Sequence, residues 1–405
     1  MTEPGPPVDD RVVKGLQDEN SVGREYRGKR TAWEENSVGR ELRGREQRGK
    51  RTDREENCGE DNSEGREPRG KKTVRGYGMR RVRGKQRSAK MDGKILVVGA
   101  AILDVLAGPA DEGVFQTGSS PADAITMRTG GDALNEATVL AKLGEEVRLL
   151  TVLGEDPAAE IIRGHCRKWG IGLEFARTEP GVDTGINVVL VKENGERCFL
   201  TNPHGTLRIL SGEHLEGDFL QNVKILSFAS IFVFPRLGSK DMARLFSRAK
   251  AQGIRVCADM TKRKNGETAE DIREALSFVD FLFPNYEEAV LVTGKRELHE
   301  IADVFLDCGV GNVVIKCGDK GCFVKNREMF FESPAVPGVR CVDTTGAGDC
   351  FAAGFVYALA KEMDLHTAAA YANACGALAV QKMGATEGVG SITQVENTVK
   401  KYHSP

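Results

Sequence analysis

The sequence predicts an α/β protein with a mostly parallel, doubly wound central sheet that carries helices on both faces. Short continuous apolar runs, of which Lys94–Gly99 (KILVVG) is the first, are typical of strands buried in a parallel sheet. These runs alternate along the chain with segments of helical spacing, as a sheet built from βαβ units requires. An Asn-Gly hairpin does not fit such units and predicts a small additional β element.

The elements that follow the first strand come in the expected alternation. Asp132–Leu143 has helical spacing and stops before a glycine, and Val147–Val152 is the next strand. Asp156 is a favourable capping residue and Pro157 a favourable first-turn residue, so together they open a helix over Pro157–Trp169.

The additional β element interrupts this alternation. Ile186–Val191 and Arg197–Thr201 flank Asn194-Gly195, which is a strong hairpin signal. A Gly-rich stretch within residues 105–127 is equally foreign to a βαβ unit. We therefore expect residues 105–127 and 185–201 to form a small β element that is separate from the central sheet.

Strand and helix then alternate again to the end of the chain. Strands are predicted at Ile225–Phe228, Arg255–Ala258, Phe281–Phe283, Asn312–Lys316 and Cys322–Lys325, and helices at Lys240–Gln252, Tyr286–Val292, Gly348–Lys361 and His366–Lys382.

Residues 1–90 differ in composition from residues 91–405. The segment repeats Glu-Asn-Ser-Val-Gly-Arg-Glu at Glu19–Glu25 and Glu35–Glu41, and its few apolar residues are not periodic. Such a segment buries too little surface to offset its chain entropy, so we expect a disordered leader. It holds 24 Lys and Arg against 17 Asp and Glu, a net charge of +7, whereas the rest of the chain carries −9.

Several interpretations of the leader stay open. Translation that starts at Met91 would leave the leader outside the working protein, and an inert linker is a second interpretation. A nucleic-acid tether or a targeting arm is a third, but the many acidic residues argue against both. We therefore expect residues 91–405 to be the functional domain and expect no nucleic-acid partner.

The bulk composition predicts a cytoplasmic protein. The ten cysteines include no Cys-x-x-Cys pair and no cluster with zinc-ligand spacing, so free thiols in a reducing compartment are expected. The N-terminus has no apolar signal region, and no run of about 18 apolar residues occurs, so we expect no membrane association.

The segment from Asp343 to Asp349, DTTGAGD, carries the most chemistry. Gly346, Ala347 and Gly348 stand at the start of an apolar helix, where small residues leave backbone N–H groups accessible to an anion. A phosphoryl group in transfer accumulates negative charge and would be stabilised there. Asp349 lies at the same helix start and can accept a proton from a hydroxyl beside that group.

A second motif lies at Gly130-Gly131-Asp132-Ala133-Leu134-Asn135-Glu136-Ala137. Paired glycines let a ligand hydroxyl approach the backbone, and the Asn135 amide can both donate and accept a hydrogen bond. Gly130, Gly131 and Asn135 are therefore candidate substrate-binding residues.

Together, the two motifs resemble the two signatures of the PfkB (ribokinase-like) family of carbohydrate kinases, from about Lys94 to the C-terminus. The resemblance extends past Asp349 to Ala353-Gly354-Phe355-Val356. It implies a ribokinase-like fold, with Asp349 as catalytic base and Gly346–Gly348 as the anion hole. It also implies ATP and Mg²⁺ as cofactors, although the chain has no Walker A string.

Further site residues are implied by their positions in the resemblance. Asp104 would bind two substrate hydroxyls, and Asn285 and Glu288 would organise Mg²⁺, Glu288 through a water. The nucleotide would contact Lys316, Gly318, Gly321 and Asn373, although Lys316 departs from the family's usual Thr. Asp343, Thr345, Ala379 and Gly384 resemble a monovalent-cation loop, which makes K⁺ activation a hypothesis.

The resemblance implies ATP-dependent phosphorylation of a hydroxyl of a small sugar, with ribose or a ketose first. Ser227–Val233 lacks the carboxylate of ribokinases proper, which argues against ribose itself, and Gly195-Glu196-Arg197 and Asp259 resemble fructokinase-like and ketogluconate-kinase-like members. Arg197 could also meet an anionic substrate group. A nucleoside kinase, with Phe199, Phe232 or Phe234 for stacking, and a non-catalytic regulator stay open. The resemblance also implies that the small β element of residues 105–127 and 185–201 closes over the site as a lid, and that two chains form a homodimer through their lids.

Overall fold

Residues 93–193 and 197–402 are described by the computed structural model, and they lie in one structural unit, Gly84–Pro405. The predicted leader over residues 1–90 and the Asn194-Gly195 turn lie outside the described residues. Among the described residues, no helix has the length and apolar character needed to cross a membrane.

The central sheet has eight strands in the order β14-β13-β12-β11-β10-β9-β1-β4. The six strands from β12 to β4 in that order are parallel, and β13 and β14 add an antiparallel edge. Their bounds are β1 Lys94–Gly99, β4 Val147–Leu150, β9 Val223–Ile231, β10 Arg255–Met260, β11 Phe281–Phe283, β12 Asn312–Lys316, β13 Cys322–Lys325 and β14 Phe330–Ser333. The predicted fold class, a mostly parallel α/β sheet, is confirmed.

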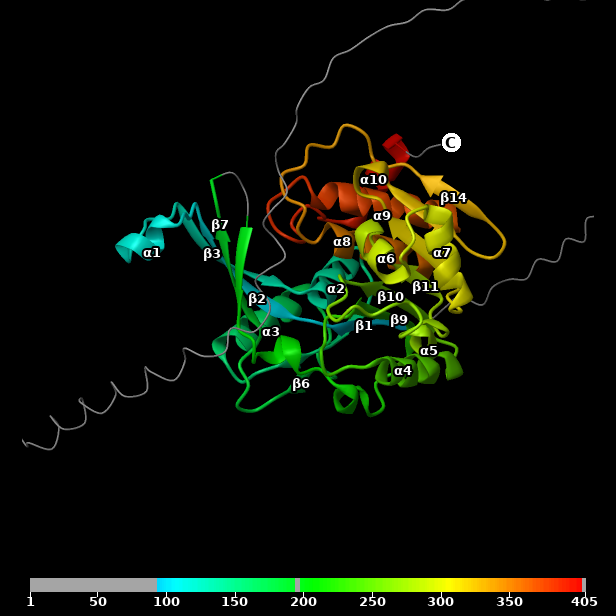
Figure 1. The fold of residues 1–405 in the computed structure, drawn as a ribbon, viewed down its shortest axis with the longest axis horizontal. Helices are drawn as coiled ribbons and strands as arrows, with labels where there is room; N and C mark the ends of the chain where they lie inside the picture. The colour runs from blue at the N-terminus through cyan, green and yellow to red at the C-terminus, as the bar shows by residue number, and fades with distance from the viewer. Residues whose placement is uncertain (1–92, 194–196, 403–405) are drawn as a thin grey trace, which may run out of the picture. The chain divides into compact units, whose positions relative to one another are not determined.

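Helices cover both faces of this sheet (Figure 1). Alternate residues of β1 show the two faces, because Ile95 and Val97 pack in one buried cluster and Leu96 and Val98 in the other. The first cluster includes residues of α2 Asp132–Lys142, α3 Pro157–Trp169, α8 Ala347–Ala360, α9 Leu365–Ala379 and α10 Ile392–Tyr402. The second includes residues of α4 Ser239–Ala251, α5 Arg273–Leu276, α6 Tyr286–Thr293 and α7 Leu298–Asp307.

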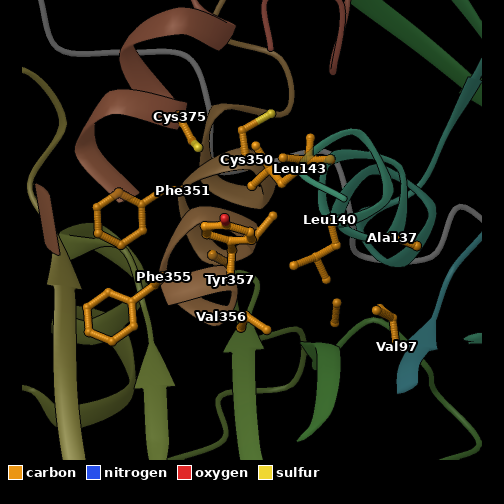
Figure 2. Packing of buried hydrophobic residues seen from close by; sticks show 14 of the residues in the cluster. Val97, Ala137, Leu140, Leu143, Cys350, Phe351, Phe355, Val356, Tyr357 and Cys375 are labelled. Carbon is orange, nitrogen blue, oxygen red and sulfur yellow. The ribbon is translucent and has the colours of Figure 1, made fainter. Parts of the chain in front are cut away.

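Helix α8 is the central element of the first face. Eleven of its residues, from Cys350 to Ala360, are buried, so the helix is apolar on all sides. Figure 2 shows its Phe351 and Phe355 above the strands, with Leu140 of α2 and Cys375 of α9 close to the same helix. This packing fixes the position of the first turn of α8. The predicted catalytic loop, Asp343–Asp349, leads into that turn.

A second, four-stranded sheet has the order β3-β2-β7-β8. Its strands are β2 Ile102–Gly108, β3 Ala124–Gly130, β7 Ile186–Val191 and β8 Arg197–Thr201, and the short helix α1 Gly113–Thr117 lies between β2 and β3. β2 and β7 are parallel, and the other two pairs are antiparallel. We call this the small sheet.

The predicted elements differ from the observed ones in places that have a physical explanation. The predicted strand Val147–Val152 divides after Leu150, because β5 Val152–Leu153 leaves the central sheet and pairs with β6 Arg177–Thr178. The helices α7 and α10 were missed. In α7 the buried Ile301, Ala302, Phe305 and Leu306 have the helical spacing that would have identified it.

Candidate active site

The catalytic loop predicted from the sequence forms the N-terminus of α8. Gly346 is the residue before the first turn and has a left-handed backbone with φ 69°, and a Cβ there would lie 2.4 Å from the carbonyl oxygen of Ala385. Only glycine fits that position. The start of a fourteen-residue helix thus presents its backbone N–H groups without side-chain obstruction from Gly346 or Gly348.

Asp349 is held in the first turn of α8 by the other motif. Asn135 of α2 donates a hydrogen bond from Nδ2 to Oδ2 of Asp349 over 2.8 Å. Burial raises the pKa of Asp349 well above its ordinary value, and the nearby Asp132 adds to that, while the Asn135 bond opposes it. A carboxyl group with a raised pKa is a stronger base for a proton from an alcohol.

A buried ion pair lies beside this loop. Nζ of Lys316, at the end of β12, is 2.8 and 2.6 Å from the two carboxylate oxygens of Asp259 at the end of β10. Burial alone would lower the pKa of Lys316, but Asp259, Glu288 and Asp349 together hold it above its ordinary value. A Cβ on Gly348 would lie 3.3 Å from Nζ, so the lysine charge reaches the predicted anion hole.

These groups open into one cavity of about 820 Å³. Its lining includes Asp132, Ser230, Asp259, Asn285, Glu288, Lys316, Gly318, Gly348 and Asp349. The cavity therefore brings together predicted residues from three separate parts of the sequence, at the carboxyl ends of the parallel strands, where ligands of such sheets bind.

Asn285 and Glu288 form a reciprocal cap at the start of α6. The Asn285 side chain accepts from the backbone N–H of Glu288 over 2.8 Å, and Oε2 of Glu288 accepts from the N–H of Asn285 over 2.9 Å. Burial raises the pKa of Glu288 to about 7. A cation at this carboxylate would offset the cost of burying its charge, so the residues fit a magnesium ion.

Asp132 and Ser230 line the cavity and Glu136 is buried near them, and none of the three was predicted as a site residue. Ser230 donates a 2.8 Å hydrogen bond to Asp132, which lines the cavity. Glu136 is 1% exposed, and burial raises its pKa to about 8. The signal was present in the motif itself, since Asp132 and Glu136 are four residues apart on α2 and on either side of Asn135.

The predicted substrate side lies where the small sheet meets α2. Asn187 of β7 donates a 3.0 Å hydrogen bond to Asp104 of β2, and burial raises the pKa of Asp104. Gly131 has φ 94°, and a Cβ there would lie 2.6 Å from the Ala100 carbonyl oxygen. A Cβ on Gly130 would lie 2.3 Å from Oδ2 of Asp104, so the glycine pair and this carboxylate are neighbours.

The predicted nucleotide residues divide into two groups. Lys316 and Gly318 line the cavity, and Gly321 closes the same turn with φ 94°, where a Cβ would lie 2.1 Å from the Ser333 carbonyl oxygen. Asn373 of α9 is buried apart from the cavity lining, and its Nδ2 donates to backbone and side-chain oxygens near the end of β14 over 3.1 Å. Its predicted nucleotide contact stays a prediction.

The predicted monovalent-cation loop is assembled in part around Asp343. Oδ1 of Asp343 accepts from the backbone N–H and the hydroxyl of Thr345, and Oδ2 accepts from the N–H of Gly384 over 2.8 Å. Ala379 precedes Val380, whose carbonyl accepts from the N–H of Asp343. Arg197 of β8 binds the same carboxylate over 2.8 Å, so with the guanidinium in place these residues do not fit a free cation. In the described residues, no group of three or more His, Cys, Asp or Glu forms a metal cluster.

Residues 92–391 are similar to known proteins in both sequence and structure. The model of the pfkB family of carbohydrate kinases matches residues 92–391. An ATP-dependent ribose-1-phosphate kinase from Halopiger xanaduensis is 30% identical over 63% of this chain and 81% of its own length, and fructokinase-2 of Oryza sativa is 27% identical over 67% and 85%. The structure of Arabidopsis thaliana ribokinase complexed with ribose and ATP superposes with a TM-score of 0.64 at 25% identity, over 76% of this chain and 99% of that one.

Proposed function

The chain belongs to the pfkB family of carbohydrate kinases, and we propose that it transfers the γ-phosphoryl group of ATP to a hydroxyl of a small sugar with Asp349 as the base. The family and the ATP-dependent relatives make the chain an ATP-dependent carbohydrate kinase. The residue roles and the sugar are what we propose. The observation that carries them is the position of Asp349, which shares the first turn of α8 with the anion site and is bonded to Asn135.

The proposed reaction is a direct displacement at the γ-phosphorus. The sugar hydroxyl gives its proton to the Asp349 carboxylate as its oxygen forms the new P–O bond. The bond between the γ-phosphorus and the bridging oxygen breaks, and ADP leaves with that electron pair. The raised pKa of Asp349 favours the transfer of the proton to it.

The transferred group needs positive partners while its charge spreads. Backbone N–H groups at Gly346–Gly348 and the start of the α8 dipole supply one set. Lys316, held by Asp259 next to Gly348, supplies a full charge on the same side. We assign Lys316 to the phosphoryl group, whereas Gly318 and Gly321 are assigned to the nucleotide.

Glu288 and Asn285 would hold Mg²⁺, with Glu288 acting through a water. The ion would neutralise phosphate oxygens of ATP when bound. The hydrogen bond between Oε2 of Glu288 and the N–H of Asn285 fixes the carboxylate against the helix, so its direction does not depend on the ligand.

Asp104, Gly130, Gly131 and Asn135 are assigned to the sugar. The central strand β9 contributes Ser230 to the cavity and no carboxylate, and Asp259 and Asp132 supply the acidic groups from neighbouring elements. The relatives named for ribose 1-phosphate and fructose make phosphorylated and free sugars the first substrates to test.

The nucleoside-kinase alternative needs an aromatic side chain to stack on a base. Phe234 is buried in the second core cluster, which leaves Phe232 and the 60% exposed Phe199 of β8. The same substrate panel tests this alternative, since turnover of nucleosides and not of sugars would favour it.

We also propose that the small sheet acts as a lid and pairs between two copies of the chain. Its strands carry several exposed apolar side chains, and Ile125 and Met127 share one face of β3, 70% and 64% exposed. Burying such a patch against an identical one would exclude water and hold the two lids together. Light scattering of the wild type beside Met127→Glu tests this, and an unchanged monomer in both would contradict it.

The test of the function is an ADP-release assay over free sugars, phosphosugars and nucleosides. We expect turnover of one class by the wild type and, for Asp349→Asn, a loss of about 10²- to 10⁴-fold in kcat with ATP binding retained. Turnover that survives in Asp349→Asn would overturn the role of Asp349. No turnover of any acceptor by a protein that binds ATP would contradict the proposed substrate class.

A further inference from the structure

Arg197 joins the small sheet to the predicted catalytic loop in the part of the chain that the structure describes. It is the first residue of β8, and its side chain is 20% exposed. One terminal nitrogen lies 2.8 Å from Oδ1 of Asp343, and the other donates to the hydroxyl of Thr345. A guanidinium on a strand of the small sheet thus sits on the two residues that lead into Gly346.

Asp343 is built to hold a positive partner. Its side chain is 3% exposed and accepts from the backbone N–H groups of Thr345 and Gly384 and from the Thr345 hydroxyl. Burial alone would raise the pKa of Asp343, but these bonds and Arg197 lower it to about 2. The carboxylate is therefore ionised at neutral pH, and in the described residues its partner cation is the guanidinium of Arg197.

Arg197 binds side-chain oxygens of two residues of the predicted monovalent-cation loop. Asp343 and Thr345 were predicted as potassium ligands, yet their side-chain oxygens face guanidinium N–H groups. Two cations a few ångströms apart would repel each other in this buried setting. Burial raises the pKa of Asp104, and the charge of Arg197 opposes that rise, so Arg197 lies within electrostatic range of the substrate side as well as in contact with the loop.

We propose that Arg197 is a built-in cation that takes the place of a monovalent ion at the Asp343–Thr345 loop and so orders the entrance to the anion hole. This inference rests on the proposed kinase function. Arg197 acts through the loop and is a positioning residue. Because the charge is carried by β8, the loop is ordered only when the small sheet lies against it, which couples the movement of the lid to the assembly of the site.

The competing role for Arg197 is contact with an anionic substrate group. Both terminal nitrogens are already engaged with the loop, and one also lies 3.7 Å from the sulfur of Met383. A substrate phosphate would have to displace Asp343 from the guanidinium and leave a buried carboxylate without its cation, which is costly.

The first experiment needs no turnover. Thermal unfolding of the full chain is compared in KCl, NaCl and choline chloride at equal ionic strength, for the wild type, Arg197→Ala and the control Arg244→Ala. Arg244 is 62% exposed on α4 and binds Glu216. We expect the wild type and Arg244→Ala to unfold at the same temperature in all three salts. The unfolding temperature of Arg197→Ala should rise with K⁺ concentration until the site is saturated, because an ion that binds only the folded state stabilises it.

The second experiment uses turnover. The wild type should work equally in the three salts, and Arg197→Ala should lose about 10- to 100-fold in kcat and recover part of it in guanidinium chloride or KCl. The kcat of Arg197→Lys should lie between those of the wild type and Arg197→Ala, because lysine keeps the charge but lacks the forked hydrogen-bonding geometry of the guanidinium.

Three outcomes would overturn the proposal. The first is a wild type that is stabilised or activated by K⁺ over choline, and the second is an Arg197→Ala protein that no cation stabilises or rescues. The third is a change confined to KM for anionic substrates, which would assign Arg197 to the substrate. If the wild type turns over nothing, the unfolding experiment still decides the role of Arg197, so the two failures can be told apart.

Discussion

The Nδ2 amide of Asn135 lies 2.8 Å from Oδ2 of Asp349, although the two residues are 214 positions apart in the chain. The bond joins α2 to the first turn of α8, and both helices pack in the same buried cluster. An amide that donates to a carboxylate stabilises the ionised form. Asn135 therefore holds the carboxylate of the proposed base in place and partly offsets the rise in its pKa that burial causes.

Removal of this bond should move the pH dependence of the reaction. In Asn135→Ala the ionised form of Asp349 loses its donor, so the pKa of Asp349 rises further above its ordinary value. The base must be deprotonated to act, so the acid limb of the kcat–pH profile should move to higher pH. Steady-state rates between pH 5 and 9 measure this.

Asn187→Ala is the matched control, since Asn187 donates to the carboxylate of Asp104 and not to Asp349. It should raise KM for the sugar and leave the acid limb in place. If both variants move the limb equally, the effect does not belong to the Asn135–Asp349 bond.

Lys316 should be needed for both folding and turnover, and the two needs can be separated. Lys316→Met leaves Asp259 buried without its cation and should cost about 3–5 kcal/mol of stability. The double variant Lys316→Met/Asp259→Leu should recover most of that, since an apolar pair can replace a buried ion pair. Neither should turn over. Denaturant unfolding and kcat are the measurements, and a double variant that regains kcat would make the lysine purely structural.

Glu288→Gln should weaken the binding of Mg²⁺ at the site. The carboxylate is proposed to act on the ion through water, so its loss should raise the Mg²⁺ concentration for half-maximal rate by about 10- to 100-fold. KM for the sugar should stay unchanged. Glu274→Gln, on the exposed side of α5, is the control and should leave the Mg²⁺ titration as in the wild type. Equal titrations for all three proteins would remove Glu288 from the metal site.

Much of the fold could be predicted because its signals are local. Lys94–Gly99 and Pro157–Trp169 have the predicted bounds, because the signals for a buried strand and a capped helix come from consecutive residues. The segment from Asp343 to Asp349 predicted both the loop and the start of α8 for the same reason.

The partners of these residues could not be predicted in the same way. Lys316 and Asp259 meet because β12 and β10 end at the same edge of the sheet with β11 between them. Arg197 meets Asp343 because the small sheet and the α8 loop come together in three dimensions. Such pairings depend on strand order, which residue spacing along the chain does not contain.

Gly346 should tolerate no side chain, for two separable reasons. Gly346→Ala would place a Cβ 2.4 Å from the Ala385 carbonyl oxygen in a left-handed backbone, so we expect lost stability and a fall in kcat of about 100-fold. Gly144→Ala is the control, because φ there is 91° and no atom lies within 4 Å of the added Cβ. It should cost only about 1–2 kcal/mol of backbone strain and keep kcat. Equal losses in the two variants would mean that the clash at Gly346 has no effect.

Glu136 should make the folded protein less stable as the pH rises. Burial raises the pKa of its carboxyl from 4.5 to about 8, while a hydrogen bond with Ser227 and the charge of Lys316 oppose that rise. Below pH 4.5 the group is protonated in both states. Between about 4.5 and 8 the unfolded chain releases a proton that the folded protein keeps, so the free energy of unfolding falls over this range.

Glu136→Gln removes the titration and keeps the shape, so its stability should rise relative to the wild type across that same range. Glu145 is the matched control, since burial would raise its pKa but Lys361 and Lys224 lower it. Relative to Glu145→Gln, the wild type should therefore gain stability as the pH rises through the ordinary carboxyl range. Urea midpoints at five pH values measure both trends. Parallel curves for the wild type and Glu136→Gln would mean that Glu136 is already ionised in the folded protein, and its place beside Lys316 would then be that of a second counter-ion.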